Sequence, residues 1–218
     1  SVSFKLYDNG SGATFILGYE LAFNPNNDVV TPIEINSRSV AQTGAYVYES
    51  LQEAINACVL GDNTVTILNS SEEDVRIEQK EGINIVIDGW YQELKGTIAI
   101  DGNNRSNGTE TLTIQNVNFV ADTKCDIIYD VKTGNSYAHN VTIKNCNFTS
   151  TNNSHDVVAA RFEQSYNVQI IGGTFNGLHS VMQGKSSDTE RPFVIDGITV
   201  NNCQSGIALT TSYKAVVK

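Results

Sequence analysis

The segments Leu112-Thr-Ile-Gln-Asn-Val-Asn-Phe119 and Val141-Thr-Ile-Lys-Asn-Cys-Asn-Phe148 follow one pattern, position by position. Three further segments align with them without a gap: Ile85–Trp90, Val168–Phe175 and Phe193–Val200. The third position is always isoleucine, at intervals of 27, 29, 27 and 25 residues: Ile87, Ile114, Ile143, Ile170 and Ile195. Self-similarity at this period indicates a protein built from stacked repeats.

Each repeat has the pattern of a strand followed by a bend. Apolar residues two apart, such as Val141 and Ile143, flank a polar residue, which is the period of a strand with one buried face. Two positions after the isoleucine comes a residue type that adopts positive φ at little cost: Gly89, Asn116, Asn145, Gly172 and Gly197. The aromatic or aliphatic residues that follow are expected to point inward: Phe119, Phe148, Phe175 and Val200.

A second strand follows in each coil, after turns of variable length. These strands are predicted at Ile127–Tyr129, Val157–Ala159, Ser180–Met182 and Gly206–Leu209. The sequence therefore predicts an all-β fold, a right-handed parallel β-helix solenoid. A β-sandwich would not need recurring isoleucine and Gly/Asn columns, and a doubly wound α/β fold would need helical patterns between the strands.

The ends of the chain differ from the repeats. Residues 49–58 have one apolar stripe, with Ser50 as N-cap and Glu53 three residues later, and predict a helix that caps the solenoid. The coils are expected from about residue 64, so that the β-helix domain covers 41–218. Residues 1–40 read as a small β element or the tail of a preceding domain. The last strand-like run reaches Lys218, which predicts a domain truncated at the C-terminus.

Composition restricts the partners. The chain has 14 Lys and Arg against 24 Asp and Glu, a formal charge of −10, so no nucleic acid partner is expected. No apolar run approaches the roughly 18 residues of a membrane span, so no membrane insertion is predicted in this segment.

Cysteine and histidine spacing predicts no metal site. The four cysteines have no CxxC pairing, which favours buried free thiols over a disulfide: Cys58, Cys125, Cys146 and Cys203. His139 precedes a strand and His155 lies in an Asn/Ser turn, so both are expected at the surface. No cofactor is predicted, although a structural or catalytic calcium ion stays open.

The stretch Thr43-Gly-Ala-Tyr-Val-Tyr-Glu-Ser-Leu-Gln-Glu-Ala-Ile-Asn-Ala57, with Gly61-Asp-Asn-Thr-Val-Thr-Ile-Leu68 and Ile83-Asn-Ile-Val-Ile-Asp-Gly89 after it, resembles the opening of β-helix domains in large bacterial surface proteins. The Val-Thr-Ile-x-Asn-x-x-Phe coils are similar to the pectin-lyase-like superfamily, and the likeness covers about residues 43–218. It implies an extracellular or cell-surface location, and polysaccharide or another surface protein as partner. It leaves activity undecided, because that superfamily includes lyases, hydrolases and noncatalytic adhesins.

One group of residues is a candidate for catalysis. Aligning the second strands places Asp126, Asp156 and His179 at near-equivalent positions, and Arg161 beside them in a column with Asp130 and Gln183. Two carboxylates with an imidazole suit acid/base work on a glycosidic bond or cation binding, and Arg161 suits a uronate. The alternative is a solvated face on which Arg161 pairs with Asp130 or Glu163.

Three aromatic residues are candidates for ligand binding by stacking on sugar rings: Trp90, Tyr91 and Tyr129. Trp90 also stands in the column of Val117 and Cys146, which favours a place in the wall or core. Because the catalytic motifs of polygalacturonase-type hydrolases are missing from the sequence, we expect a noncatalytic module for binding or display. A carbohydrate-active enzyme, either a polysaccharide lyase or a glycoside hydrolase, and a structural spacer are the alternatives.

Overall fold

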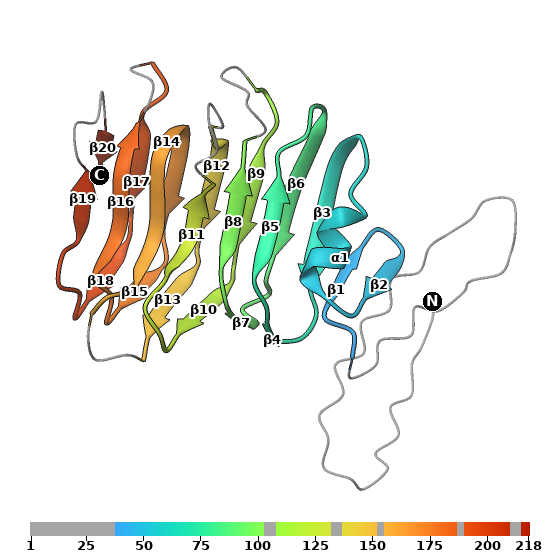
Figure 1. Ribbon diagram of the computed structural model, residues 1–218, viewed down its shortest axis with the longest axis horizontal. Helices are drawn as coiled ribbons and strands as arrows, with labels where there is room; N and C mark the ends of the chain where they lie inside the picture. Colours follow the sequence, from blue (N-terminus) through green and yellow to red (C-terminus); the bar gives the residue numbers. More distant parts are fainter. Residues whose placement is uncertain (1–37, 103–107, 132–136, 152–154, 187–189, 210–214) are drawn as a thin grey trace, which may run out of the picture.

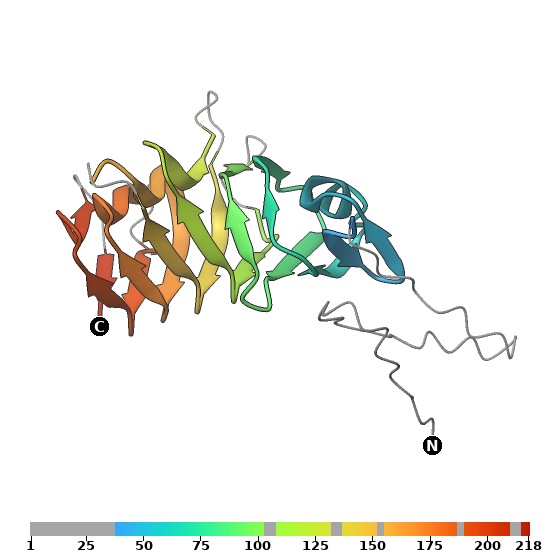
Figure 2. The same cartoon turned by 90° about the horizontal axis from the view of Figure 1, so that it is seen from below.

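The computed structural model describes residues 38–102, 108–131, 137–151, 155–186, 190–209 and 215–218. Over these ranges the chain is an all-β parallel solenoid of about five turns. Successive coils stack along the long axis, with the one described helix at the N-terminal end (Figures 1 and 2). The predicted parallel solenoid is confirmed. The predicted β element at 1–40 falls almost wholly outside the described residues.

Within the described residues, three parallel sheets form the wall. Sheet A contains β3 (Gly61–Ile67), β6 (Ile83–Asp88), β9 (Leu112–Gln115), β12 (His139–Lys144), the end of β14 (Val158–Ile171), β17 (Phe193–Asp196) and β20 (Ala215–Val217). Sheet B contains β4 (Ser71–Glu72), β7 (Glu93–Lys95), β10 (Asn118–Ala121), β13 (Asn147–Ser150), β15 (Thr174–Asn176) and β18 (Thr199–Asn201). Sheet C contains β5 (Val75–Glu78), β8 (Ile98–Asp101), β11 (Asp126–Asp130), the start of β14, β16 (Ser180–Ser186) and β19 (Ile207–Leu209). The four predicted second strands therefore lie in sheet C.

The isoleucine column forms a buried spine in sheet A. Ile87 pairs with Ile114, Ile114 with Ile143, and Ile143 with Ile170, all in parallel register. Ile195 continues the column. All five side chains are at most 1% exposed, and each contributes on the order of 1.5–3 kcal/mol by burial. The predicted like-over-like stacking is confirmed.

Sheet B contributes a stack of phenylalanines to the same core. The rings of Phe119 and Phe148 are 4.8 Å apart at 13°, and those of Phe148 and Phe175 are 4.9 Å apart at 9°. These distances match the spacing of adjacent strands. Val200 takes the same position in β18 but is 40% exposed.

The corner between sheets A and B carries the predicted left-handed column. Asn116, Asn145, Gly172 and Gly197 have φ of 54°, 52°, 66° and 64°. The prediction was wrong for Gly89, whose φ is not positive. Its glycine is needed for another reason, because a Cβ there would lie 2.5 Å from the Asn116 carbonyl oxygen.

The first coil follows a short antiparallel region and a helix. β1 (Ala41–Thr43) pairs antiparallel with β2 (Tyr46–Tyr48) and with β3. The helix α1 (Leu51–Asn56) is shorter than the predicted 49–58, and Ser50 Oγ accepts from Glu53 N at 3.1 Å. It buries Leu51, Ala54 and Ile55. In the part of the chain that the structure describes, no helix has the length and apolar character needed to cross a membrane.

Candidate functional site

Trp90 and Tyr91 project from a tight turn at the corner between sheets A and B. Their φ angles are 45° and 61°, and Gln92 N donates to Gly89 O at 2.7 Å. Positive φ at both central residues of such a turn is the mark of type I′, which favours Asn and Gly at these positions. Trp90 is nevertheless 58% exposed and Tyr91 55% exposed. We call residues 89–92 the aromatic turn.

The aromatic turn is fixed by its own strand and by the next coil. Asp88 Oδ1 accepts from Trp90 N at 3.2 Å and from Asn116 Nδ2 at 3.1 Å. Tyr91 N donates to Asn116 O at 2.6 Å, and Tyr91 O accepts from the side-chain amide of Asn118. These hydrogen bonds involve the backbone of Trp90 and Tyr91, so they fix the conformation of the turn. Both rings are left exposed to solvent.

The prediction that Trp90 shares the column of Val117 was wrong. Four residues, 89–92, connect Asp88 to Glu93, whereas two residues, 116–117, connect their partners Gln115 and Asn118. The aromatic turn is therefore a two-residue insertion that bulges outward. Its sequence signal is the next inward residue, Leu94, which comes two positions later than the gapless pattern requires.

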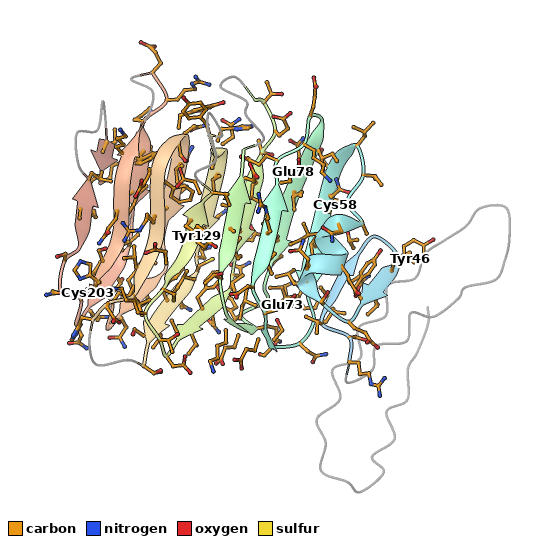
Figure 3. The ribbon with its side chains drawn as sticks, viewed as in Figure 1. Tyr46, Cys58, Glu73, Glu78, Tyr129 and Cys203 are labelled. Atoms are coloured by element: carbon orange, nitrogen blue, oxygen red, sulfur yellow. The ribbon has the colours of Figure 1, made fainter. Side chains whose placement is uncertain are left out.

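The structure joins two of the four catalytic candidates. Arg161 Nε donates to Asp126 Oδ2 at 2.7 Å, and both side chains are about one-third exposed, at 34% and 32%. Tyr129 pairs with Arg161 in sheet C, and Figure 3 shows it at the middle of that sheet. Asp130, which was an alternative partner of Arg161, is instead buried, and its carboxylate accepts from Glu163 N and Ser165 Oγ.

The register of sheet C differs from the alignment that suggested the catalytic group. Asp126 pairs with Val158, two residues after Asp156, and Val158 pairs with Ser180. His179 lies just before that column, with its Nδ1 2.7 Å from Gln204 Oε1 and 3.1 Å from the His155 carbonyl oxygen. Asp156 is half-buried, and its charge adds to the effect of burial and of other carboxylates in raising the pKa of the Cys125 thiol. Asp126 and His179 therefore bond to different side chains, Arg161 and Gln204 respectively.

A polar ladder, buried except at Arg191, lies where four successive coils enter sheet A, and the sequence analysis missed it. His139 Nε2 is 3.1 Å from Glu110 Oε2, with side-chain exposures of 0% and 1%. The ring of Tyr166 stacks on His139 with centroids 5.5 Å apart, and the Arg191 guanidinium lies 3.8 Å from the centre of the Tyr166 ring. The expectation that His139 lies at the surface was therefore wrong. We call Glu110, His139, Tyr166 and Arg191 the polar ladder.

A signal for the polar ladder was present in the spacing. Its four residues each stand four positions before an isoleucine of the spine, so they occupy one column of the repeat. Gln79 also holds the polar ladder in place: its side-chain amide donates to His139 O at 2.6 Å and accepts from His139 N at 3.0 Å. A Cβ on Gly108 would lie 2.0 Å from His139 Nε2. The polar ladder is thus packed too tightly to hold a ligand, and its contacts join successive coils.

The described residues contain no group of three or more His, Cys, Asp or Glu that could hold a metal ion. The four cysteines are free thiols, and of these only Cys146 is buried. Desolvation raises the pKa of Cys146 to about 12 and, with nearby carboxylates, that of Cys125 to about 11. Neither thiol is a ready nucleophile at neutral pH.

Comparisons with protein-family models, with curated proteins and with solved structures give no match to this chain. Its class therefore follows from its own geometry: it is an all-β protein of parallel β-solenoid architecture.

Proposed function

We propose that this solenoid is a noncatalytic cell-surface module that binds glycan through the aromatic turn. The observation that carries the proposal is the conformation of Trp90 and Tyr91. Bulky residues rarely adopt positive φ, and backbone outliers of this kind are concentrated at functional sites. A single exposed aromatic residue needs no explanation, but two adjacent ones on an unfavourable turn do.

The chemistry of the two rings fits a sugar. Indole and phenol rings combine a large apolar face with a polar edge, so they stack on the C–H face of a pyranose while hydrogen-bonding a hydroxyl. The fixed backbone of the aromatic turn also reduces the entropy lost on binding. The formal charge of −10 disfavours strongly anionic glycans, so a neutral glycan is the preferred ligand.

We also infer that α1 caps the first coil of a right-handed β-helix of the pectin-lyase-like kind. The helix contacts β1, β2, β3 and β5, and Glu73 Oε1 accepts from Leu51 N at 2.9 Å. Covering the end of a solenoid prevents its apolar interior from associating with other chains. Replacing Ile55 with Asp is expected to cause concentration-dependent self-association, measured by light scattering. A variant that stays monomeric would contradict this capping role.

Trp90 is the one tryptophan of the chain, so its fluorescence reports directly on the aromatic turn. We expect a saturable shift in emission with at least one neutral polysaccharide from a panel of glucans, mannans, galactans and xylans. Trp90→Ala and Tyr91→Ala should abolish retardation of the protein in native gels containing that polysaccharide. Tyr46→Ala is the matched control, because Tyr46 is 71% exposed on β2, at the N-terminal end of the molecule (Figure 3).

Two outcomes would contradict the proposal. If no polysaccharide in the panel shifts the emission or retards the protein, the aromatic turn does not bind glycan. If the protein releases reducing sugar or unsaturated product from the panel, it is a carbohydrate-active enzyme rather than a binding module.

A further inference from the structure

The outer surface of sheet B forms an ordered polar array next to the aromatic turn. Two rows of side chains point outward from β10, β13, β15 and β18, held in register by parallel pairing. One row is Asn118, Asn147, Thr174 and Thr199, and the other is Val120, Thr149, Asn176 and Asn201. We call these eight residues the polar face.

The polar face carries no charge, in contrast to the adjoining strands of the same sheet. On those strands Lys95 of β7 lies 3.4 Å from Glu72 of β4, and Lys95 also lies 2.9 Å from Asp122, which follows β10. Seven of the eight residues of the polar face carry an amide or a hydroxyl, groups that both donate and accept without selecting an ion. The amides of Asn118 and Asn147 already bond within the sheet. A shallow open hollow lies over it, with Thr149, Asn176 and the partly exposed Val200 among its lining residues. Its chemistry therefore fits a neutral ligand rich in hydroxyl groups.

The polar face is continuous with the aromatic turn. Asn118 N donates to Gln92 O at 3.0 Å, its side-chain amide donates to Tyr91 O, and its Oδ1 accepts from Asn147 Nδ2 at 2.9 Å. One chain of hydrogen bonds thus links the aromatic turn to the first two side chains of the row. From β7 to β18 the sheet spans four strand spacings, roughly 19 Å. One strand spacing is close to the length of one sugar unit in an extended β-linked chain.

We propose that the polar face is a binding track for a neutral, extended polysaccharide, which begins at the aromatic turn and runs along the solenoid axis with one strand per sugar unit. The track rests on the proposed function, because the aromatic turn supplies its first contact. It adds the ligand class, an extended chain rather than a terminal sugar, and the direction of that chain along the solenoid.

The track predicts that affinity rises with oligosaccharide length. The probes are homologous neutral β-linked oligomers, from disaccharide to octasaccharide, of cellulose, mannan and xylan, titrated against Trp90 fluorescence. In the Thr149→Val/Asn176→Ala variant, the longest oligomers should bind about tenfold more weakly, as expected for two lost hydrogen bonds, while disaccharide binding is unchanged. Thr142→Val is the control, since Thr142 lies on sheet A, away from the polar face.

The outcomes separate the track from the aromatic turn. Affinity that does not depend on length, or a Thr142→Val variant that weakens long oligomers as much as the polar-face variant does, would overturn the track and leave the aromatic turn as a site for one or two sugars. No fluorescence change with any oligomer would overturn the track, and no change with any polysaccharide of the wider panel would overturn the proposed function as well.

Discussion

Two corners of the solenoid depart from the pattern of apolar core and polar surface in opposite ways. Between sheets A and B, the departure is the aromatic turn, whose Trp90 and Tyr91 side chains are exposed. Where each coil enters sheet A, the departure is the polar ladder, whose Glu110 and His139 side chains are buried. Side chains that face the interior at a corner join neighbouring coils, whereas side chains that face outward at a corner are available to a ligand.

Both departures are unfavourable locally, but only one is compensated inside the protein. Burying polar side chains costs hydration free energy, which the polar ladder offsets through its ring contacts and the Glu110–His139 hydrogen bond. Each non-glycine residue at positive φ costs about 1–2 kcal/mol. The Trp90 and Tyr91 rings recover little of that by burial, which is why we assign them a role in binding.

The largest effect is expected at the polar ladder. His139→Leu removes a ring that is hydrogen-bonded to the buried Glu110 side chain and stacked on Tyr166, and should destabilise the protein by about 3–5 kcal/mol. Urea unfolding followed by circular dichroism measures the loss. His179→Leu is the control, because the His179 ring contacts the exposed side chain of Gln204 and should cost less than about 1 kcal/mol. Equal losses in the two variants would remove the distinction between inner and outer polar residues.

The next effect is expected at the support of the aromatic turn. Gly89→Ala would place a methyl group 2.5 Å from Asn116 O and 2.6 Å from Val117 Cγ2, and should cost about 2–3 kcal/mol through overpacking. Gly206→Ala, with open space around the added methyl group, should change stability by less than about 0.5 kcal/mol. Thermal unfolding of both variants compares the two sites. A stable Gly89→Ala protein would show that coils are not packed this closely at the corner.

A smaller effect is expected at Asn145, at a corner between sheets A and B that lacks the two-residue insertion. Asn145→Ala should lose about 1 kcal/mol, because alanine tolerates its φ of 52° less well than asparagine does. Asn145→Gly should keep or raise stability, since glycine has no Cβ to oppose positive φ. Chemical denaturation distinguishes these outcomes. If alanine and glycine behaved alike, backbone conformation would not explain the Gly/Asn column.

The smallest effect is expected on the outer surface of sheet C. Asp126→Asn breaks a pair that is one-third exposed and should cost about 0.5 kcal/mol, a difference that high salt reduces. Unfolding at low and high ionic strength measures it. A loss as large as that at the polar ladder would mean that Arg161 and Asp126 hold the coils together.

The sequence predicted what the repeat itself specifies. The Ile87–Ile195 column and the Phe119–Phe175 column were predictable because burial in a stacked coil selects one residue type at one position. The left-handed residues after the isoleucine were predictable because few residue types accept that conformation.

The predictions that failed concerned features that the pattern of a single coil does not specify, namely turn lengths, contacts between coils and an insertion. The Asp126–Val158 register was missed because turns of different length precede the sheet C strands, so equal spacing in the sequence does not give the pairing there. The burial of His139 was missed because its partners lie in neighbouring coils and histidine is usually exposed. Trp90 was misplaced because an insertion after Gly89 interrupts the pattern.

The most direct test of the account is to restore the residues that a type I′ turn prefers. The Trp90→Asn/Tyr91→Gly variant should be more stable than the natural chain by about 1 kcal/mol and should lose its retardation by neutral polysaccharide. A variant that is less stable than the natural chain, or that still binds the polysaccharide, would contradict the claim that Trp90 and Tyr91 lower the stability of the turn but are needed for binding.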